Sequence, residues 1–178
     1  ARDARSEITL PADCPLGPVW KQLTQNESVT NPTVIYATNL PITLESAADN
    51  TTPEGSQQFT MPAGINGRIS EDSDVDCFRF TAKKDEKYTF EVRARRYQSS
   101  LDPYLRIINL DGKLIAENDD LRDFKRSFAD SRIENWTGPA DGEYAIEIRD
   151  MHLRGGDSYV YFIEATKAEP HVRLYADT

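Results

Sequence analysis

Long apolar runs and reactive side chains are scarce in this sequence of 178 residues. No stretch approaches the roughly 18 consecutive apolar residues that a membrane-spanning helix needs, so we expect no membrane insertion. The two histidines are His152 and His171, and neither has a nucleophile motif near it. The serine pair Ser99-Ser100 has no evident base and no strand-to-helix elbow, which a serine nucleophile of that type requires. We therefore expect that the protein is not an enzyme.

Positive charge is the minority sign in this chain. Its 21 Lys and Arg residues are outnumbered by 30 Asp and Glu residues, which gives a formal net charge of −9. A surface of this kind repels phosphate backbones and anionic lipid headgroups, so we expect no nucleic-acid partner. The apolar fraction of 38% and the charged fraction of 29% are those of a globular protein that buries a core.

Helical periodicity is also scarce, and the strongest pattern repeats every two residues. Apolar and charged side chains alternate in segments 90–95 and 143–149, which predicts strands with one buried and one exposed face. Residues 159–163 are apolar on both faces and predict a central strand. Turn-forming pairs such as Asn66-Gly67 separate the strands, whereas residues 119–129 read as a long loop. We predict an all-β fold, a jelly-roll-like antiparallel β-sandwich with extra N-terminal strands.

The chain falls into three segments that differ in composition and in strand-like pattern. Residues 1–44 hold five of the ten prolines and strand-like pieces at 19–23 and 33–36, and they form either the end of a preceding domain or edge strands. Residues 45–167 form the predicted sandwich. Residues 168–178 form a C-terminal tail or the start of a following domain. We expect an excerpt of a larger multidomain protein, monomeric within it.

The densest group of carboxylates lies at Asp72, Asp74 and Asp76, directly before Phe78 and Phe80. Crowded carboxylates repel one another, so solvent, a hydrogen-bonded turn or a hard cation must hold them. The two phenylalanines alternate with polar residues and are predicted to face the core. A second acidic group, Asn118-Asp119-Asp120 with Asp102 and Asp130, is either another oxygen site or a set of loop caps.

Residues 45–167 resemble a bacterial pre-peptidase C-terminal domain, a β-sandwich module of secreted proteases and other large secreted proteins. The motifs that carry the resemblance, in order, are Gly64-Ile65-Asn66-Gly67-Arg68-Ile69, Asp74-Val75-Asp76, Phe78-Arg79-Phe80, Leu101-Asp102-Pro103-Tyr104-Leu105-Arg106, Asp111-Gly112-Lys113-Leu114-Ile115-Ala116-Glu117-Asn118-Asp119-Asp120, Asp141-Gly142-Glu143-Tyr144 and Tyr159-Val160-Tyr161. The flanks Pro15-Leu16-Gly17-Pro18 and Asn39-Leu40-Pro41 are similar to the setting of this domain in large exported proteins of planctomycete-like bacteria.

The resemblance implies a calcium site, because related modules of clostridial collagenases bind calcium between an acidic linker and the Asp-x-Asp turn. The linker here is Glu45-Ser46-Ala47-Ala48-Asp49-Asn50, in which Ala47 replaces a second glutamate of the family-like pattern. Oxygen-only ligands favour calcium over zinc. The expected ligand set is Glu45, Asp49, Asn50, Asp72, Asp74 and Asp76. The alternative is a solvated acidic loop whose aspartates cap turns.

Cys14 and Cys77 form no metal-binding pair and are either two thiols or one long-range disulfide. Both depart from the residue types that the resemblance implies at their positions, which favours the disulfide. It would tie the N-terminal segment to the sandwich.

A row of basic and aromatic side chains is the candidate ligand surface. Arg93, Arg95, Arg96 and Tyr97 are predicted to be exposed, since alternate positions take the inner face, and Arg154 extends the row. Such a patch suits an anionic glycan or an acidic peptide, whereas the alternative is a solvated strand face. The aromatic residues Trp20, Trp136 and Tyr104 are predicted to lie in the core, the alternative being that they stack on sugar rings.

The sequence therefore favours a non-catalytic accessory module of an exported protein, secreted, periplasmic or on the cell surface. Its expected partner is a polysaccharide or an extracellular protein, and its expected cofactor is Ca²⁺. The alternative is a structural spacer or processing module with no ligand of its own.

Overall fold

The computed structural model describes residues 7–25, 28–46, 49–123 and 126–168. The chain divides into two compact units, which meet between Asn39 and Leu40. The predicted C-terminal tail lies outside the described residues except for Ala168, as does His171. Each unit is described by itself.

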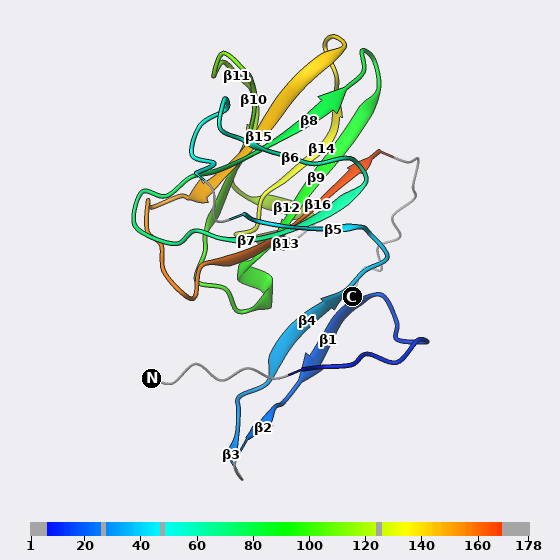
Figure 1. The fold of residues 1–178 in the computed structure, drawn as a ribbon, viewed down its shortest axis with the longest axis vertical. Coiled ribbons are helices and arrows are strands. Elements are labelled where there is room, and N and C mark those ends of the chain that lie inside the picture. Colours follow the sequence, from blue (N-terminus) through cyan, green and yellow to red (C-terminus); the bar gives the residue numbers. More distant parts are fainter. Residues whose placement is uncertain (1–6, 26–27, 47–48, 124–125, 169–178) are drawn as a thin grey trace. The chain divides into compact units, whose positions relative to one another are not determined.

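The first unit is a small antiparallel sheet, drawn in blue in Figure 1. Strand β1 (Gly17–Lys21) pairs with β4 (Thr33–Ala37), and the short strands β2 (Thr24–Gln25) and β3 (Ser28–Val29) pair with each other. The strand-like pieces expected here are confirmed. A two-stranded sheet has no second layer, and Trp20 in β1 is 52% exposed, so its predicted place in a core is wrong.

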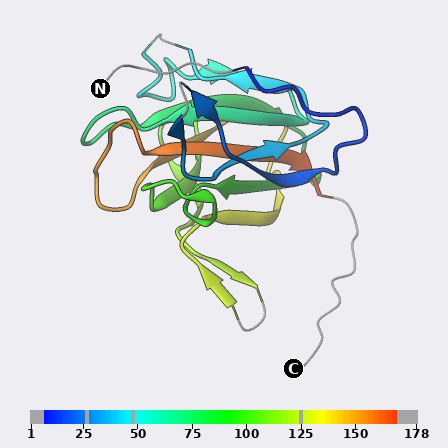
Figure 2. The same ribbon diagram turned by 90° about the horizontal axis from the view of Figure 1, so that it is seen from below.

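The second unit is a β-sandwich of two five-stranded sheets (Figures 1 and 2). One sheet has the order β11-β10-β15-β8-β6 and the other has the order β14-β9-β16-β7-β5. The strands of the first sheet are β6 (Gln57–Gln58), β8 (Asp76–Ala82), β10 (Pro103–Asn109), β11 (Leu114–Asn118) and β15 (Gly142–Asp150). Those of the second are β5 (Ile42–Leu44), β7 (Ala63–Arg68), β9 (Lys87–Arg93), β14 (Arg132–Thr137) and β16 (Val160–Lys167).

Most connections run between the two sheets, as in a jelly roll, and β10 and β11 are joined within one sheet. Strands β7 to β10 alternate between the sheets, and β15 is followed by β16 in the other sheet. Pairing is antiparallel except for the short edge strands β5 and β6, which run parallel to β7 and β8. The predicted sandwich is confirmed. Residues 42–44, which the sequence grouped with the N-terminal segment, form an edge strand of the second unit.

The core lies between the sheets and is rich in aromatic rings. Phe80 of β8 is its centre: its ring centroid lies 5.0 Å from that of Phe90 in β9 and 6.0 Å from that of Trp136 in β14. Phe78 and Phe80 are both buried, as the alternation predicted. The inner positions of β9 and β15 are buried as well, whereas the polar positions of these strands, apart from the buried Asp150 at the end of β15, lie on the outer faces.

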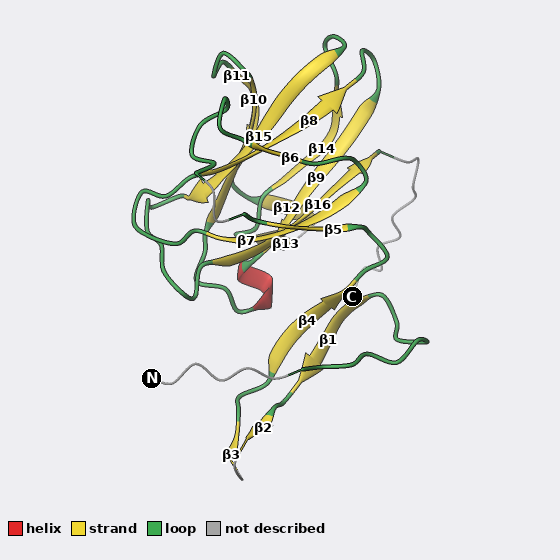
Figure 3. Cartoon of the chain, viewed as in Figure 1, coloured by secondary structure: helices red, strands yellow, loops and turns green. Residues whose placement is uncertain are grey.

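Two segments differ from the sequence prediction. The supposed loop 119–129 contains a β-hairpin, β12 (Leu121–Asp123) paired with β13 (Arg126–Phe128). The supposed turn Asn66-Gly67 lies inside β7. The single helical element that the structure describes is the 3-10 helix η1 (Arg95–Tyr97), red in Figure 3.

Candidate functional site

The acidic turn before β8 is held by backbone hydrogen bonds. Asp74 Oδ2 accepts the N–H of Ser70 at 2.5 Å, which closes the turn locally. Asp72 Oδ1 accepts the N–H of Gly155 at 3.1 Å, so this carboxylate fastens the turn to the β15–β16 loop. Ser73 has a positive φ of 68°. Two of the crowded aspartates therefore stabilise loops, as the alternative interpretation of the sequence expected.

Asp76, the first residue of β8, is different because its carboxylate is buried. The residue is 1% exposed, and its Oδ2 accepts a hydrogen bond from the Tyr161 hydroxyl, with 2.7 Å between the two oxygens. The pKa of Asp76 is raised to about 7, mainly by burial and also by the nearby carboxylates of Glu45 and Asp74, whereas the Tyr161 hydroxyl and the Asn50 side chain act in the opposite direction. Both charged neighbours named here are acidic.

The linker supplies the other side of this cluster. Glu45 Oε2 accepts the N–H of Arg68 at 2.7 Å, and the backbone oxygen of Asn50 accepts the N–H of Cys77 at 2.8 Å. The side-chain Nδ2 of Asn50 is buried and has no hydrogen-bond partner among the described residues. A buried N–H donor of this kind calls for an acceptor, such as a water molecule at the site.

Gly67 makes the cluster possible. A Cβ at this position would collide with the hydroxyl of Tyr161 and with Oε2 of Glu45. The glycine of the Asn-Gly pair is therefore needed for close approach across β7 and not for a turn. Sequence reasoning also missed Tyr161, whose hydroxyl is the direct partner of Asp76.

The structure brings together four of the six predicted calcium ligands. Glu45, Asn50 and Asp74 all act on the pKa of Asp76. Asp49 is engaged elsewhere: its Oδ1 accepts the N–H and the hydroxyl of Thr51, which lower its pKa. In the part of the chain that the structure describes, no three or more His, Cys, Asp or Glu side chains are arranged to hold a metal ion. The donor set fits a hard cation, but the described carboxylates do not enclose one.

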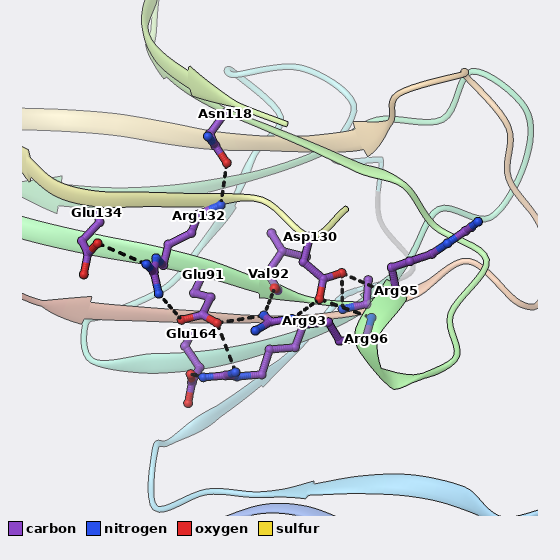
Figure 4. A network of polar contacts seen from close by, with 11 residues as sticks. Glu91, Val92, Arg93, Arg95, Arg96, Asn118, Asp130, Arg132, Glu134 and Glu164 are labelled. Atoms are coloured by element: carbon purple, nitrogen blue, oxygen red, sulfur yellow. Dashed lines mark hydrogen bonds and ion pairs between the residues drawn. The ribbon is translucent and has the colours of Figure 1, made fainter. Parts of the chain in front are cut away.

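The predicted basic row is not the exposed row that the alternation indicated, and Figure 4 shows why. Arg93 on β9 pairs with Glu164 of β16 and, at 3.1 Å, with Glu91. Its side chain is only 14% exposed. Arg96 pairs with Glu91 at 2.8 Å and with Asp130, which is fully buried. The expectation of exposure is wrong for both arginines, because acidic partners on neighbouring strands and loops enclose them.

Asp130 also orders the start of η1. Its Oδ1 accepts the N–H of Ala94 at 3.2 Å and that of Arg95 at 2.6 Å, and its Oδ2 bonds the backbone and the guanidinium of Arg96. This aspartate of the second acidic group is thus a structural cap. Asn118, another member, accepts the N–H of Arg132 at 2.8 Å (Figure 4).

The other predicted ligand residues lie nearer the surface. Arg95 is exposed, and its Nη1 donates to the backbone oxygen of Ser100 at 2.9 Å. Tyr97 is half-buried, and the Arg96 guanidinium lies 5.9 Å from its ring centroid. Arg154 lies in the β15–β16 loop, and its Nε is 3.6 Å from Asp150 Oδ2. Their role in ligand binding stays a prediction.

Of the three aromatic residues expected in the core, Trp136 alone is there, packed against Phe80 and Tyr144. Tyr104 lies on the outer face of its sheet, where the Arg149 guanidinium is 4.6 Å from the ring centroid and Glu117 accepts its hydroxyl proton. The prediction for Tyr104 is wrong because its position on β10 is one of the outward-facing ones.

Both cysteines are free thiols in the structure. Cys14 belongs to the first unit, whereas Cys77 belongs to the second and is fully buried on β8. Burial, with the nearby carboxylate of Glu147, raises the pKa of the Cys77 thiol to about 12. The disulfide stays a prediction, and an enclosed, protonated thiol is a poor partner for it.

One cleft of about 310 Å³ lies beside the network of Figure 4. Its lining residues are Asn118, Asp119, Asp120, Leu121, Arg122, Arg132 and Glu134. The sequence pointed to the first three as an acidic group but gave no sign of the last four. The missing information was the hairpin β12–β13, which places Leu121 and Arg122 beside the edge strand β14.

Over the residues that the structure describes, no helix has the length and apolar character needed to cross a membrane. No family model matches the chain. No curated protein matches it either. Among solved structures, the pre-peptidase C-terminal domain of collagenase from Bacillus anthracis is similar, with a TM-score of 0.43 and 10% sequence identity over 62% of this chain and 92% of that one.

Proposed function

We propose that the second unit is a non-catalytic accessory module of the pre-peptidase C-terminal kind, within a larger exported protein such as those of planctomycete-like bacteria. Its partner is a polysaccharide or an extracellular protein, met outside the cytoplasm. The ordered motifs of residues 45–167 and the sandwich support this assignment. The observation that carries it is the buried Asp76 carboxylate, which faces acidic Glu45 and Asp74 at the junction of linker and sandwich.

Calcium stabilises this junction. Glu45, Asn50, Asp74 and Asp76 are the residues that would hold the ion, since they supply the hard oxygen donors that calcium prefers. When bound, calcium supplies positive charge and no chemistry of bond breaking. It would offset the repulsion by Glu45 and Asp74 that adds to the effect of burial on the pKa of Asp76. The linker around Glu45 and Asn50 would thereby be fastened to the start of β8.

Thermal unfolding with and without calcium tests the metal site. At about 100 times Kd, a ligand of the folded state adds about 2.7 kcal/mol, which raises the Tm of a chain of this size by about 5–10 °C. We expect this increase on adding CaCl2 to EDTA-treated protein. It should be lost in Glu45→Gln and Asp76→Asn, and kept in Asp157→Asn, whose carboxylate is fully exposed. An unchanged Tm in the wild type would exclude calcium as a cofactor.

A spacer without a ligand of its own is the second candidate. It is favoured because Arg93 and Arg96, which could otherwise contact a partner, are paired with the protein's own carboxylates Glu164 and Asp130. Screening the full chain on glycan and extracellular-protein arrays separates the two candidates. Saturable binding to any member supports the binding module, and its absence on both arrays supports the spacer.

A further inference from the structure

The cleft between β11, the β12–β13 hairpin and β14 has the size and lining of a small binding site. Its volume of about 310 Å³ lies at the lower end of the range for ligand pockets, roughly 300–1,000 Å³. Among the described residues of the lining, Leu121 is apolar and the others carry amide, carboxylate or guanidinium groups. An apolar ligand would find few partners here.

The cleft walls are ordered before any ligand arrives. Asn118 Oδ1 accepts the N–H of Arg132 at 2.8 Å, which joins β11 to β14 across the two sheets (Figure 4). The Arg132 guanidinium is aimed by Glu134, 3.3 Å from its Nη2, and by Glu91, 3.8 Å from its Nη1. Preorganised polar groups lose little freedom on binding.

Two carboxylates of the cleft are not used by the fold. Within the described residues, no hydrogen bond or ion pair engages the side chains of Asp119 and Asp120, in contrast to Asn118 and Arg132. Asp119 is exposed and Asp120 is half-buried, so both can accept hydrogen bonds from a ligand.

The charges of the lining exclude two ligand classes. Three carboxylates and two guanidinium groups leave a small negative excess, which disfavours an anionic ligand in a chain of net charge −9. A metal ion is disfavoured by the two arginines, and no group of three or more acidic, His or Cys side chains among the described residues is arranged to hold one. A neutral molecule with many hydroxyls remains, because each hydroxyl both donates to carboxylates and accepts from guanidinium and amide groups.

We propose that this cleft binds a neutral sugar unit of a polysaccharide. Asp119 and Asp120 accept hydrogen bonds from neighbouring hydroxyls, and Arg122, Arg132 and the Asn118 amide donate hydrogen bonds to hydroxyl or ring oxygens. Because none of the described residues that line the cleft is aromatic, these residues offer no stacking surface, and one site binds weakly. This inference rests on the proposed binding function and assigns it a site and a ligand class.

The test is a titration of the full ¹⁵N-labelled chain with cellohexaose, xylohexaose and mannohexaose, with hexagalacturonate as the anionic comparison. We expect at least one neutral hexasaccharide to shift the amide signals of residues 118–122 and 132–134 saturably. The double variant Asp119→Asn/Asp120→Asn should weaken binding by about tenfold or more, since hydrogen bonds to charged groups are lost. Asp119→Asn alone should weaken it less, and Asp157→Asn, outside the cleft, should not change it.

Several outcomes would overturn the proposal, and they separate it from the proposed function. Shifts confined to other residues would refute the cleft while leaving the binding module intact. Binding of hexagalacturonate alone would refute the neutral ligand class. If no oligosaccharide binds, the cleft proposal fails, and the protein array then decides between an extracellular-protein partner and a spacer. The same spectra show whether each variant keeps its fold.

Discussion

Removing the carboxylate of Asp130 should destabilise the sandwich strongly, although the residue lies on a connecting segment outside the apolar core. Asp130 is fully buried and accepts the N–H groups of Ala94, Arg95 and Arg96 as well as the Arg96 guanidinium. In Asp130→Ala these donors lose their acceptor, and Arg96 keeps Glu91 as its carboxylate partner. Breaking a buried ion pair from one side costs about 3–5 kcal/mol, so Tm should fall by about 10 °C.

Urea unfolding followed by tryptophan fluorescence measures this loss. Trp136 reports on the sandwich core, and a Trp20→Phe background removes the signal of the other tryptophan. The midpoint should fall with an unchanged m-value, because the surface exposed on unfolding is the same. As a control, Asp157→Ala breaks an exposed pair with Arg68 and should cost less than about 1 kcal/mol.

A double-mutant cycle with Arg96→Met separates the ion pair from the cap. If the network acts as a unit, the double variant should be more stable than the sum of the single effects implies, by about 0.5–3 kcal/mol. The reasoning is refuted if Asp130→Ala costs less than about 1 kcal/mol. It is also refuted if the two substitutions add within about 0.5 kcal/mol, since additivity is the mark of independent sites.

Three further predictions concern the core and the candidate site. In EDTA, the raised pKa of Asp76, about 7 against an ordinary 3.8, means that its contribution to stability is fully present below pH 3.8 and is lost as pH rises through 7. The wild type should thus lose roughly 4 kcal/mol relative to Asp76→Asn between pH ~4 and ~8 in urea titrations, and parallel profiles would contradict this. In the native chain Cys14 should react with Ellman's reagent, and the buried Cys77 should react only after unfolding. If neither thiol reacts in the unfolded chain until a reductant is added, the disulfide is established. Phe80→Ala should cost about 3–5 kcal/mol in the same urea assay, and a loss below ~1 kcal/mol would mean that the aromatic cluster is not the centre of the core.

The layers of the sandwich were predictable because alternation reports which side chains point inward. Phe90 and Val92 in β9, and Ile146 and Ile148 in β15, are fully buried as their spacing indicated. The hairpin β12–β13 was not predictable in this way. Its six residues are mostly polar, and the hairpin is defined by backbone pairing such as Leu121 with Phe128, which leaves no mark on composition.

On the outer face of the second sheet, the alternation of apolar and polar residues does not predict which side chains are buried. Alternation places Glu91 and Arg93 on the outward face, and an outward position predicts exposure to solvent. The register of β9 and β16 sets Glu164 opposite Glu91, a repulsive pair that Arg93 neutralises by contacting both carboxylates. On the other side β14 sets Arg132 opposite Glu91. Register is a long-range property, so the burial of these charges could not be predicted from the β9 segment alone.

At the acidic turn, alternation predicts some features of the site, and long-range contacts determine the others. Its position before a core strand was predictable, since Phe78 and Phe80 fix which face of β8 is inward, and Asp76 shares that face by the same two-residue period. The spacing does not reveal that Asp76 is fully buried, nor that its hydrogen-bond partner is Tyr161 of β16. The Tyr161 hydroxyl reaches this carboxylate because Gly67, its partner on the neighbouring strand β7, has no side chain in its way. An Asn-Gly pair read as a turn is therefore part of the site. Because Asp76 is buried beside acidic neighbours, its ionised carboxylate destabilises the folded state. Protonation of Asp76 or binding of a cation would each reduce this free-energy cost.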